Sequence, residues 1–166
     1  MKKTILVIAG LTLLMGGCKT RSDNTGQYMG EMANDSRLAE NNITRLVRVD
    51  DLHIAFDFMS MPYHMQMMKL MKADMKHAEG ATHGLMVTVM DYQSKKILKD
   101  AQVSLTITEP GGKATKHETE VMEGAGMHHY AIHLKAQRHG VYLISSQIKY
   151  KGKVYKAKTE FSPNEK

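Results

Sequence analysis

Methionine and histidine gather in one short segment, and their side chains are the ones in this chain best suited to chemistry. Seven of the 15 methionines fall between residues 59 and 75, with His64 among them and His77 and His83 just beyond. A thioether is a soft, neutral donor that suits Cu(I), and imidazole binds both Cu(I) and Cu(II), whereas carboxylates suit harder ions. Free thiols tend to form disulfides in oxidising compartments, so methionine offers a safer soft donor there. The segment therefore predicts a copper site, with Cu(I) favoured over Cu(II).

A helix over residues 62–77 would align these side chains. Pro62 suits the first turn of a helix, and the segment contains no glycine and mostly good helix formers. A projection at 100° per residue places His64, Met68 and Met71 on one face, about one and two turns apart, while Met65 lies among lysines. We therefore predict that His64, Met68 and Met71 form the helix side of the site.

A second group of possible ligands lies further along the chain. If residues 128–134 form a strand, a period of two puts Met127, His129, Ala131 and His133 on one face. The other face, with His128, Tyr130, Ile132 and Leu134, has the composition of a core. We predict His83, Met127 and His129 as the ligands from outside the helix, and we expect the isolated His53, His117 and His139 to be surface residues.

For the methionines, two alternatives to a metal site remain open. Methionine fills irregular cores, and a stripe of methionines at helical spacing is often packing rather than ligation. A flexible methionine-rich face can also bind partner proteins or hydrophobic ligands.

The N-terminus has the layout of a secretory signal peptide over residues 1–17. Lys2 and Lys3 precede an apolar run of about twelve residues, which is short of the roughly twenty that span a membrane. The Gly16-Gly17-Cys18 sequence resembles the lipobox of bacterial lipoproteins, although Met15 stands where that motif generally has leucine. We expect cleavage before Cys18, acylation of this only cysteine, including palmitate, and attachment to a membrane through the lipid.

Charge and composition narrow the partners and the location. Loss of residues 1–17 lowers the formal net charge from +6 to +4, and the basic residues are spread out without interleaved aromatics. We therefore expect no nucleic-acid partner. We expect the chain to face the periplasm or the exterior in the cell envelope. Lys19 lacks the aspartate that resembles an inner-membrane retention signal, which favours the outer membrane where there are two.

The remaining pattern predicts one mainly β domain over residues 44–162 after a flexible tether over 18–43. Leu52, Ile54, Phe56 and Phe58 alternate with more polar residues as in a half-buried strand. Similar patterns, separated by turn residues, predict further strands at 85–89, 103–107, 113–121, 128–134, 141–150 and 154–161. We predict an antiparallel β-sandwich with one methionine-rich α-helix, 62–77, inserted after the first strand.

The stretch from His83 to Phe161 resembles a known family. It contains Val-Thr-Val-Met-Asp at 87–91, Asp-Ala-Gln-Val at 100–103, Glu-Pro-Gly-Gly at 109–112 and Gly-Val-Tyr at 140–142. These residues look like the YtkA-like family of exported immunoglobulin-like domains and are also similar to the FixH group. The resemblance implies an immunoglobulin-like sandwich and a common association with copper handling.

Together these features predict a copper-binding lipoprotein that acts as a carrier, buffer or chaperone. An envelope protein that donates or receives copper would be its partner. No Ser-His-Asp signature, phosphate-binding glycine loop or free thiol for catalysis is visible, so we do not expect an enzyme. The alternative is a metal-free immunoglobulin-like module that binds proteins or ligands at the cell envelope.

Overall fold

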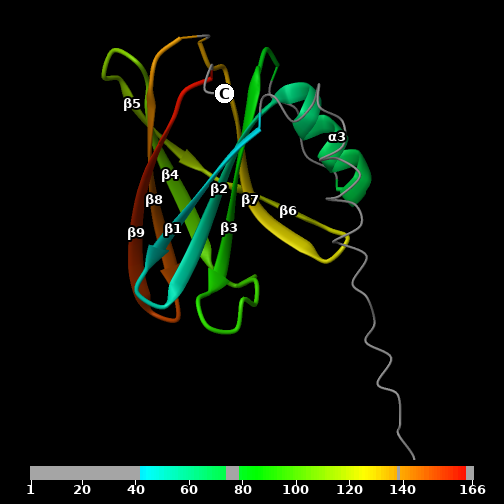
Figure 1. Ribbon diagram of the computed structural model, residues 1–166, viewed down its shortest axis with the longest axis vertical. Helices are drawn as coiled ribbons and strands as arrows, with labels where there is room; N and C mark the ends of the chain where they lie inside the picture. The colour runs from blue at the N-terminus through cyan, green and yellow to red at the C-terminus, as the bar shows by residue number, and fades with distance from the viewer. Residues whose placement is uncertain (1–41, 74–78, 138, 164–166) are drawn as a thin grey trace, which may run out of the picture.

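The computed structural model describes residues 42–73, 79–137 and 139–163 (Figure 1). The predicted signal peptide, Cys18 and nearly all of the predicted tether lie outside these ranges.

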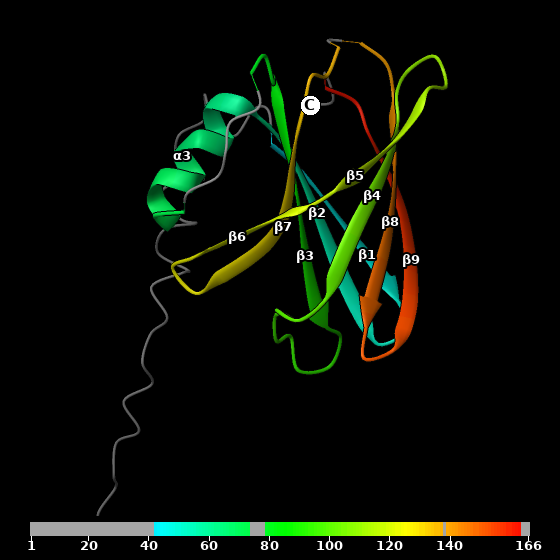
Figure 2. The ribbon, with the colours of Figure 1, turned by 180° about the vertical axis from the view of Figure 1, so that it is seen from behind.

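The described residues form two antiparallel sheets that face each other (Figures 1 and 2). The five-stranded sheet has the order β1-β2-β3-β7-β6, with β1 Asn42–Val49, β2 Leu52–Ser60, β3 His83–Asp91, β7 Met127–Leu134 and β6 Glu120–Gly124. The four-stranded sheet has the order β5-β4-β8-β9, with β5 Ala114–Glu118, β4 Gln102–Thr108, β8 Tyr142–Tyr150 and β9 Lys153–Phe161. The predicted antiparallel β-sandwich is confirmed.

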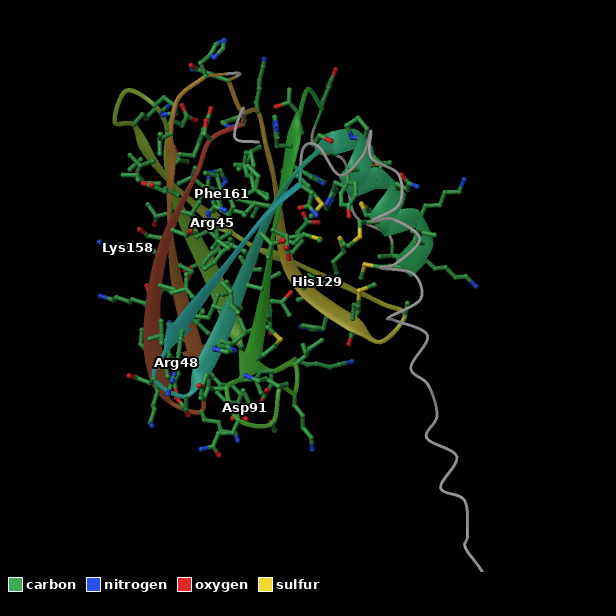
Figure 3. All side chains as sticks on the ribbon, viewed as in Figure 1. Arg45, Arg48, Asp91, His129, Lys158 and Phe161 are labelled. Atoms are coloured by element: carbon green, nitrogen blue, oxygen red, sulfur yellow. The ribbon has the colours of Figure 1, made fainter. Side chains whose placement is uncertain are left out.

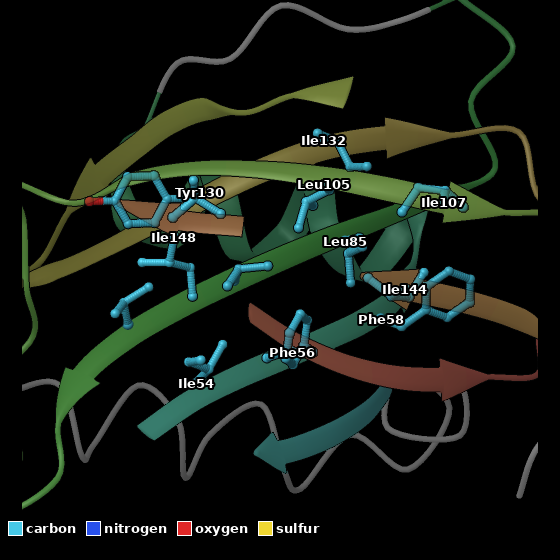
Figure 4. Packing of buried hydrophobic residues seen from close by; sticks show 14 of the residues in the cluster. Ile54, Phe56, Phe58, Leu85, Leu105, Ile107, Tyr130, Ile132, Ile144 and Ile148 are labelled. Carbon is cyan, nitrogen blue, oxygen red and sulfur yellow. The ribbon is translucent and has the colours of Figure 1, made fainter. Parts of the chain in front are cut away.

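The sandwich core is built from the alternating apolar residues of both sheets. Ile54, Phe56 and Phe58 of β2 are at most 1% exposed, and they face Leu105 and Ile144 of the other sheet (Figure 4). The alternation predicts this face because successive strand side chains point to opposite sides of a sheet.

Two features of the strands differ from the prediction. β1 pairs along its whole length with β2, so the helix follows the second strand rather than the first. The predicted strand at 113–121 is instead two strands, β5 and β6, which belong to different sheets and meet at Thr119. The Thr119 hydroxyl donates to the Val103 carbonyl at 2.8 Å, which fixes the point where the chain crosses between the sheets.

The helix, α3 (Met61–Met71), ends earlier than the helix predicted for 62–77, of which residues 74–77 lie outside the described ranges. Lys72 has a left-handed conformation, with φ of 52°. Its N–H bonds to the Lys69 carbonyl at 3.2 Å, and the Ala73 N–H bonds to the Met68 carbonyl at 3.0 Å. This Schellman pattern satisfies the last carbonyls and ends the helix. No helix in the described ranges is long and apolar enough to cross a membrane.

α3 packs against the outer face of the five-stranded sheet (Figures 1 and 2). The N–H of Met61 donates to the Thr82 carbonyl at 2.9 Å, which ties the start of the helix to the segment before β3. β3 is consequently buried on both faces from Gly84 to Val89, with the sandwich core on one side and α3 on the other.

Candidate metal centre

Methionine side chains fill the space between α3 and the sheet. We call this the methionine layer. It consists of Met59, Met67, Met68, Met71, Met86 and Met122, together with Tyr63 and Ala131. Each of these methionines is at most 5% exposed. In Figure 3 several sulfur atoms gather between α3 and the sheet. The layer is therefore a closed, apolar volume that is rich in thioethers.

A pair of histidines joins the helix to the sheet within this layer. The Nε2 atoms of His64 on α3 and His133 on β7 lie 3.1 Å apart. Their rings are nearly perpendicular, at 88°, with centroids 5.0 Å apart. His64 is fully buried, and His133 is half-buried. In this arrangement one Nε2–H donates to the other Nε2.

Gly84 makes room for the His64 ring. It is the register partner of His133 on the neighbouring strand β3. A Cβ atom placed on Gly84 would lie 2.7 Å from the Nδ1 of His64. Only a residue without a side chain leaves space for this imidazole against the sheet.

His129 occupies another part of the same outer face. Its Nδ1 lies 2.7 Å from the Thr88 hydroxyl on β3, and its cross-strand neighbour on β6 is Met122, which is fully buried. Burial, and to a lesser extent the charge of nearby His128, lowers the pKa of His129 to about 4. The ring is therefore neutral at neutral pH, which is the form that binds metal ions.

The donors fit a soft ion better than a hard one. Two nitrogens held about 2.0 Å from one tetrahedral ion would lie about 3.3 Å apart, close to the separation of the His64–His133 pair. Within the described ranges, no three side chains drawn from His, Cys, Asp and Glu group together. The buried thioethers beside the His64–His133 pair are soft donors of the kind that favours Cu(I).

The structure brings most of the predicted ligands together. His64, Met68 and Met71 all face the sheet and are buried in or beside the methionine layer. Met127 packs against the edge of the layer, and His129 lies on the same sheet face. Met65 is 40% exposed, as its position among lysines predicted.

His83, also predicted as a ligand, lies apart from this arrangement. Its ring stacks on the core residue Phe58, with centroids 4.9 Å apart. Its Nδ1 lies 2.9 Å from the hydroxyl of Thr82. The residue starts β3 in the same phase as Leu85, so its side chain points to the sandwich side of the sheet, away from α3.

Five residues of the candidate site were not among the predicted ligands: His133, Met59, Met67, Met86 and Met122. The period of two places His133 on the same face as His129. That pattern was sufficient to predict His133 as a ligand as well. Met59 and Met86 each follow a core residue by one position, so alternation indicates the outer face. No sequence pattern indicated that the helix covers this face.

Comparisons with known proteins show the fold alone. No protein-family model matches the chain and no curated protein does, so membership of the YtkA-like family stays a prediction. A DUF4426 family protein from Pseudomonas aeruginosa PAO1 is 13% identical, with a TM-score of 0.55, over 74% of this chain and 97% of that one.

Two structures of FetP from uropathogenic Escherichia coli strain F11 are also similar. FetP expressed in the periplasm matches at 13% identity and a TM-score of 0.53, over 72% of this chain and 93% of that one. A copper-bound FetP variant matches at 12% identity and a TM-score of 0.52, over 72% and 94%. This chain thus shares a β-sandwich fold with proteins of which one has been seen with copper.

Proposed function

We propose that this chain is a cell-envelope lipoprotein that binds Cu(I) in the methionine layer and acts as a copper carrier, buffer or chaperone. The observation that carries the proposal is the His64–His133 pair, whose Nε2 atoms meet at 3.1 Å among buried thioethers. The copper-bound FetP variant supports it, because a similar sandwich accommodates copper in that protein.

Burial favours Cu(I) over Cu(II) at this position. Thioethers and neutral imidazoles carry no charge, so the bound ion keeps its full charge inside an apolar layer. The desolvation cost of a buried charge rises steeply with its magnitude. Asp57, the register partner of Met86, lies beside the layer, but burial raises the pKa of its carboxyl, so a negative charge there is itself costly. A monovalent soft ion therefore suits these donors best.

The proposal extends to the parts of the chain outside the described ranges. Acylation of Cys18 would hold the domain at a membrane, and the outer membrane is favoured where there are two. The function requires binding and release rather than a reaction, so we propose no catalysis. The partner would be an envelope protein that donates or accepts copper.

Competition for Cu(I) tests this function. The purified protein is titrated anaerobically with Cu(I) against a chelator of known affinity. Met68→Leu and Met71→Leu should weaken binding while the melting temperature of the metal-free protein changes little, because leucine replaces volume but not the thioether. His64→Ala should weaken binding more, and zinc should compete poorly.

Met65→Leu is the matched control, since it makes the same change on the exposed side of the same helix. It should bind Cu(I) like the parent. If the parent retains no Cu(I) above background, the methionine layer is packing, and a metal-free binding module becomes the better account.

A further inference from the structure

One ring nitrogen of His129, Nε2, makes no hydrogen bond to the described residues. The residue is 7% exposed, and its Nε2 is buried without a hydrogen-bond partner among the described residues. Buried polar atoms are rarely left unpaired, because each loses its hydrogen bonds to water on folding. An atom left in this state in a well-packed layer is a candidate for binding a ligand.

The other nitrogen of the ring is held in the way that metal-binding histidines are held. Nδ1 lies 2.7 Å from the Thr88 hydroxyl on the adjacent strand. When Nδ1–H donates to this oxygen, Nε2 carries a free lone pair. Ligating histidines commonly donate their second N–H in this manner, which fixes both the tautomer and the ring orientation.

Two methionines neighbour His129 on this face of the sheet. Met122 is the direct cross-strand neighbour of His129, a relation that places Cβ atoms about 5 Å apart on one face of a sheet. Met127 precedes His129 by two positions on β7 and so shares the same face. Met127 is only half-buried, which gives the position access from the rim of the layer.

This position is separate from the His64–His133 pair. His129 and His133 are four residues apart on β7, which corresponds to about 13 Å along a strand. The Nε2 of His133 is already directed at His64. One ion is therefore not bound by both His129 and His133.

We infer that the methionine layer holds a second Cu(I) position, formed by His129 Nε2 and the thioethers of Met122 and Met127. This inference rests on the proposed function and deepens it, because it turns one copper site into two within the same layer. The two positions lie on the same outer face of the sheet, one at His129 and the other at His133.

Counting bound copper tests the inference. The full-length protein is loaded anaerobically with Cu(I), excess metal is removed with a weak chelator, and copper per chain is measured. The parent should retain two equivalents. His129→Phe and His64→Phe should each retain one, and the double variant none. Circular dichroism of the metal-free proteins verifies that each variant is folded.

A second pair of variants keeps the test valid if His129→Phe does not fold. Met122→Leu preserves volume and should weaken only the second equivalent. Thr88→Val removes the hydroxyl that orients the ring, and it should weaken the second equivalent by about 10- to 100-fold while leaving the first unchanged.

The outcomes separate this inference from the function on which it rests. A parent that retains one equivalent overturns the second position and leaves the proposed function standing. Two equivalents in both the parent and the His129→Phe variant would also overturn it. A parent that retains no copper overturns both.

Discussion

The His64–His133 pair depends on how tightly a buried ring fits between a helix and a sheet. His64 is fully buried, and the space for its imidazole exists because Gly84 has no side chain. The fit makes Gly84 a determinant of the proposed copper site, although glycine itself offers no donor atom.

Gly84→Ala should therefore displace the His64 ring. We expect the substitution to cost about 1–3 kcal/mol of stability through overpacking and to weaken Cu(I) binding. In a His64→Ala background the same change should cost little, because the ring that it meets is gone. Urea unfolding of the four proteins in this double-mutant cycle measures the coupling. Equal costs in both backgrounds would show that Gly84 does not accommodate His64.

His129 should make the stability of the metal-free protein depend on pH. The unfolded chain takes up a proton on this residue below about pH 6.5, whereas burial lowers the pKa in the folded protein to about 4. The free energy of unfolding should therefore fall as the pH decreases through this window, by about 2 kcal/mol between pH 7 and pH 5 from this group.

Urea unfolding at the two pH values measures this dependence. The His129→Phe variant should lose less stability than the parent on going to pH 5, because its side chain does not titrate. His83, whose pKa burial also lowers, remains in both proteins and contributes equally. Identical losses in parent and variant would contradict the placement of His129 in a buried environment.

At the scale of elements, α3 depends on the sheet beneath it. An isolated helix of 11 residues is marginal in water, so packing on the methionine layer must stabilise it. Gly124 on β6 lies directly against the backbone carbonyl of Met71 at the end of the helix. The helix is thus fitted closely to the sheet at both of its ends, at Gly84 and at Gly124.

Gly124→Ala should push the C-terminal end of α3 away from the sheet. A Cβ atom there would overlap the Met71 carbonyl, and backbone cannot move aside as easily as a flexible side chain. We expect a loss of about 1–3 kcal/mol in urea unfolding. Val121→Ala on the same strand is the control: its side chain is 54% exposed, so its cost should stay within about 0.5 kcal/mol. Equal effects would mean that β6 does not support the helix.

The sequence predicted the elements well where burial is one-sided and less well elsewhere. β2 shows a clean alternation because one face is sandwich core. β1 was missed because its residues are only half-buried, and arginines interrupt its apolar pattern. The sequence predicted the end of α3 too late. The left-handed residue that ends a helix is usually a glycine, which can be recognised in the sequence, but here Lys72 adopts this conformation.

At the scale of the whole molecule, the five-stranded sheet separates two apolar regions. Its inner face packs in the sandwich core, and its outer face packs in the methionine layer. Most of the predicted ligands lie on this outer face because helix and strand periods each indicate a face. His83 lies apart from them because its strand phase points it to the sandwich side, where it stacks on Phe58. His133 was not predicted because its contact with His64 depends on where α3 docks.

Attachment to a membrane is a property of the whole chain and rests on Cys18. We expect Cys18→Ser to abolish incorporation of labelled fatty acid and to leave the chain either soluble or as an uncleaved precursor. Labelling of cells that express the parent and the variant, followed by fractionation, measures both effects. Normal labelling of the variant would end the lipoprotein interpretation.

The central claim is that buried methionine and histidine side chains bind Cu(I) between α3 and the sheet. X-ray absorption spectroscopy of the copper-loaded protein tests it most directly, because it identifies the atoms bonded to the metal and its oxidation state. If copper binds in the methionine layer, the spectrum should show Cu(I) with both sulfur and imidazole nitrogen neighbours. Because Cys18 is the only cysteine, sulfur neighbours that persist in Cys18→Ser must be thioethers. Copper bound only by nitrogen and oxygen would contradict binding in the methionine layer.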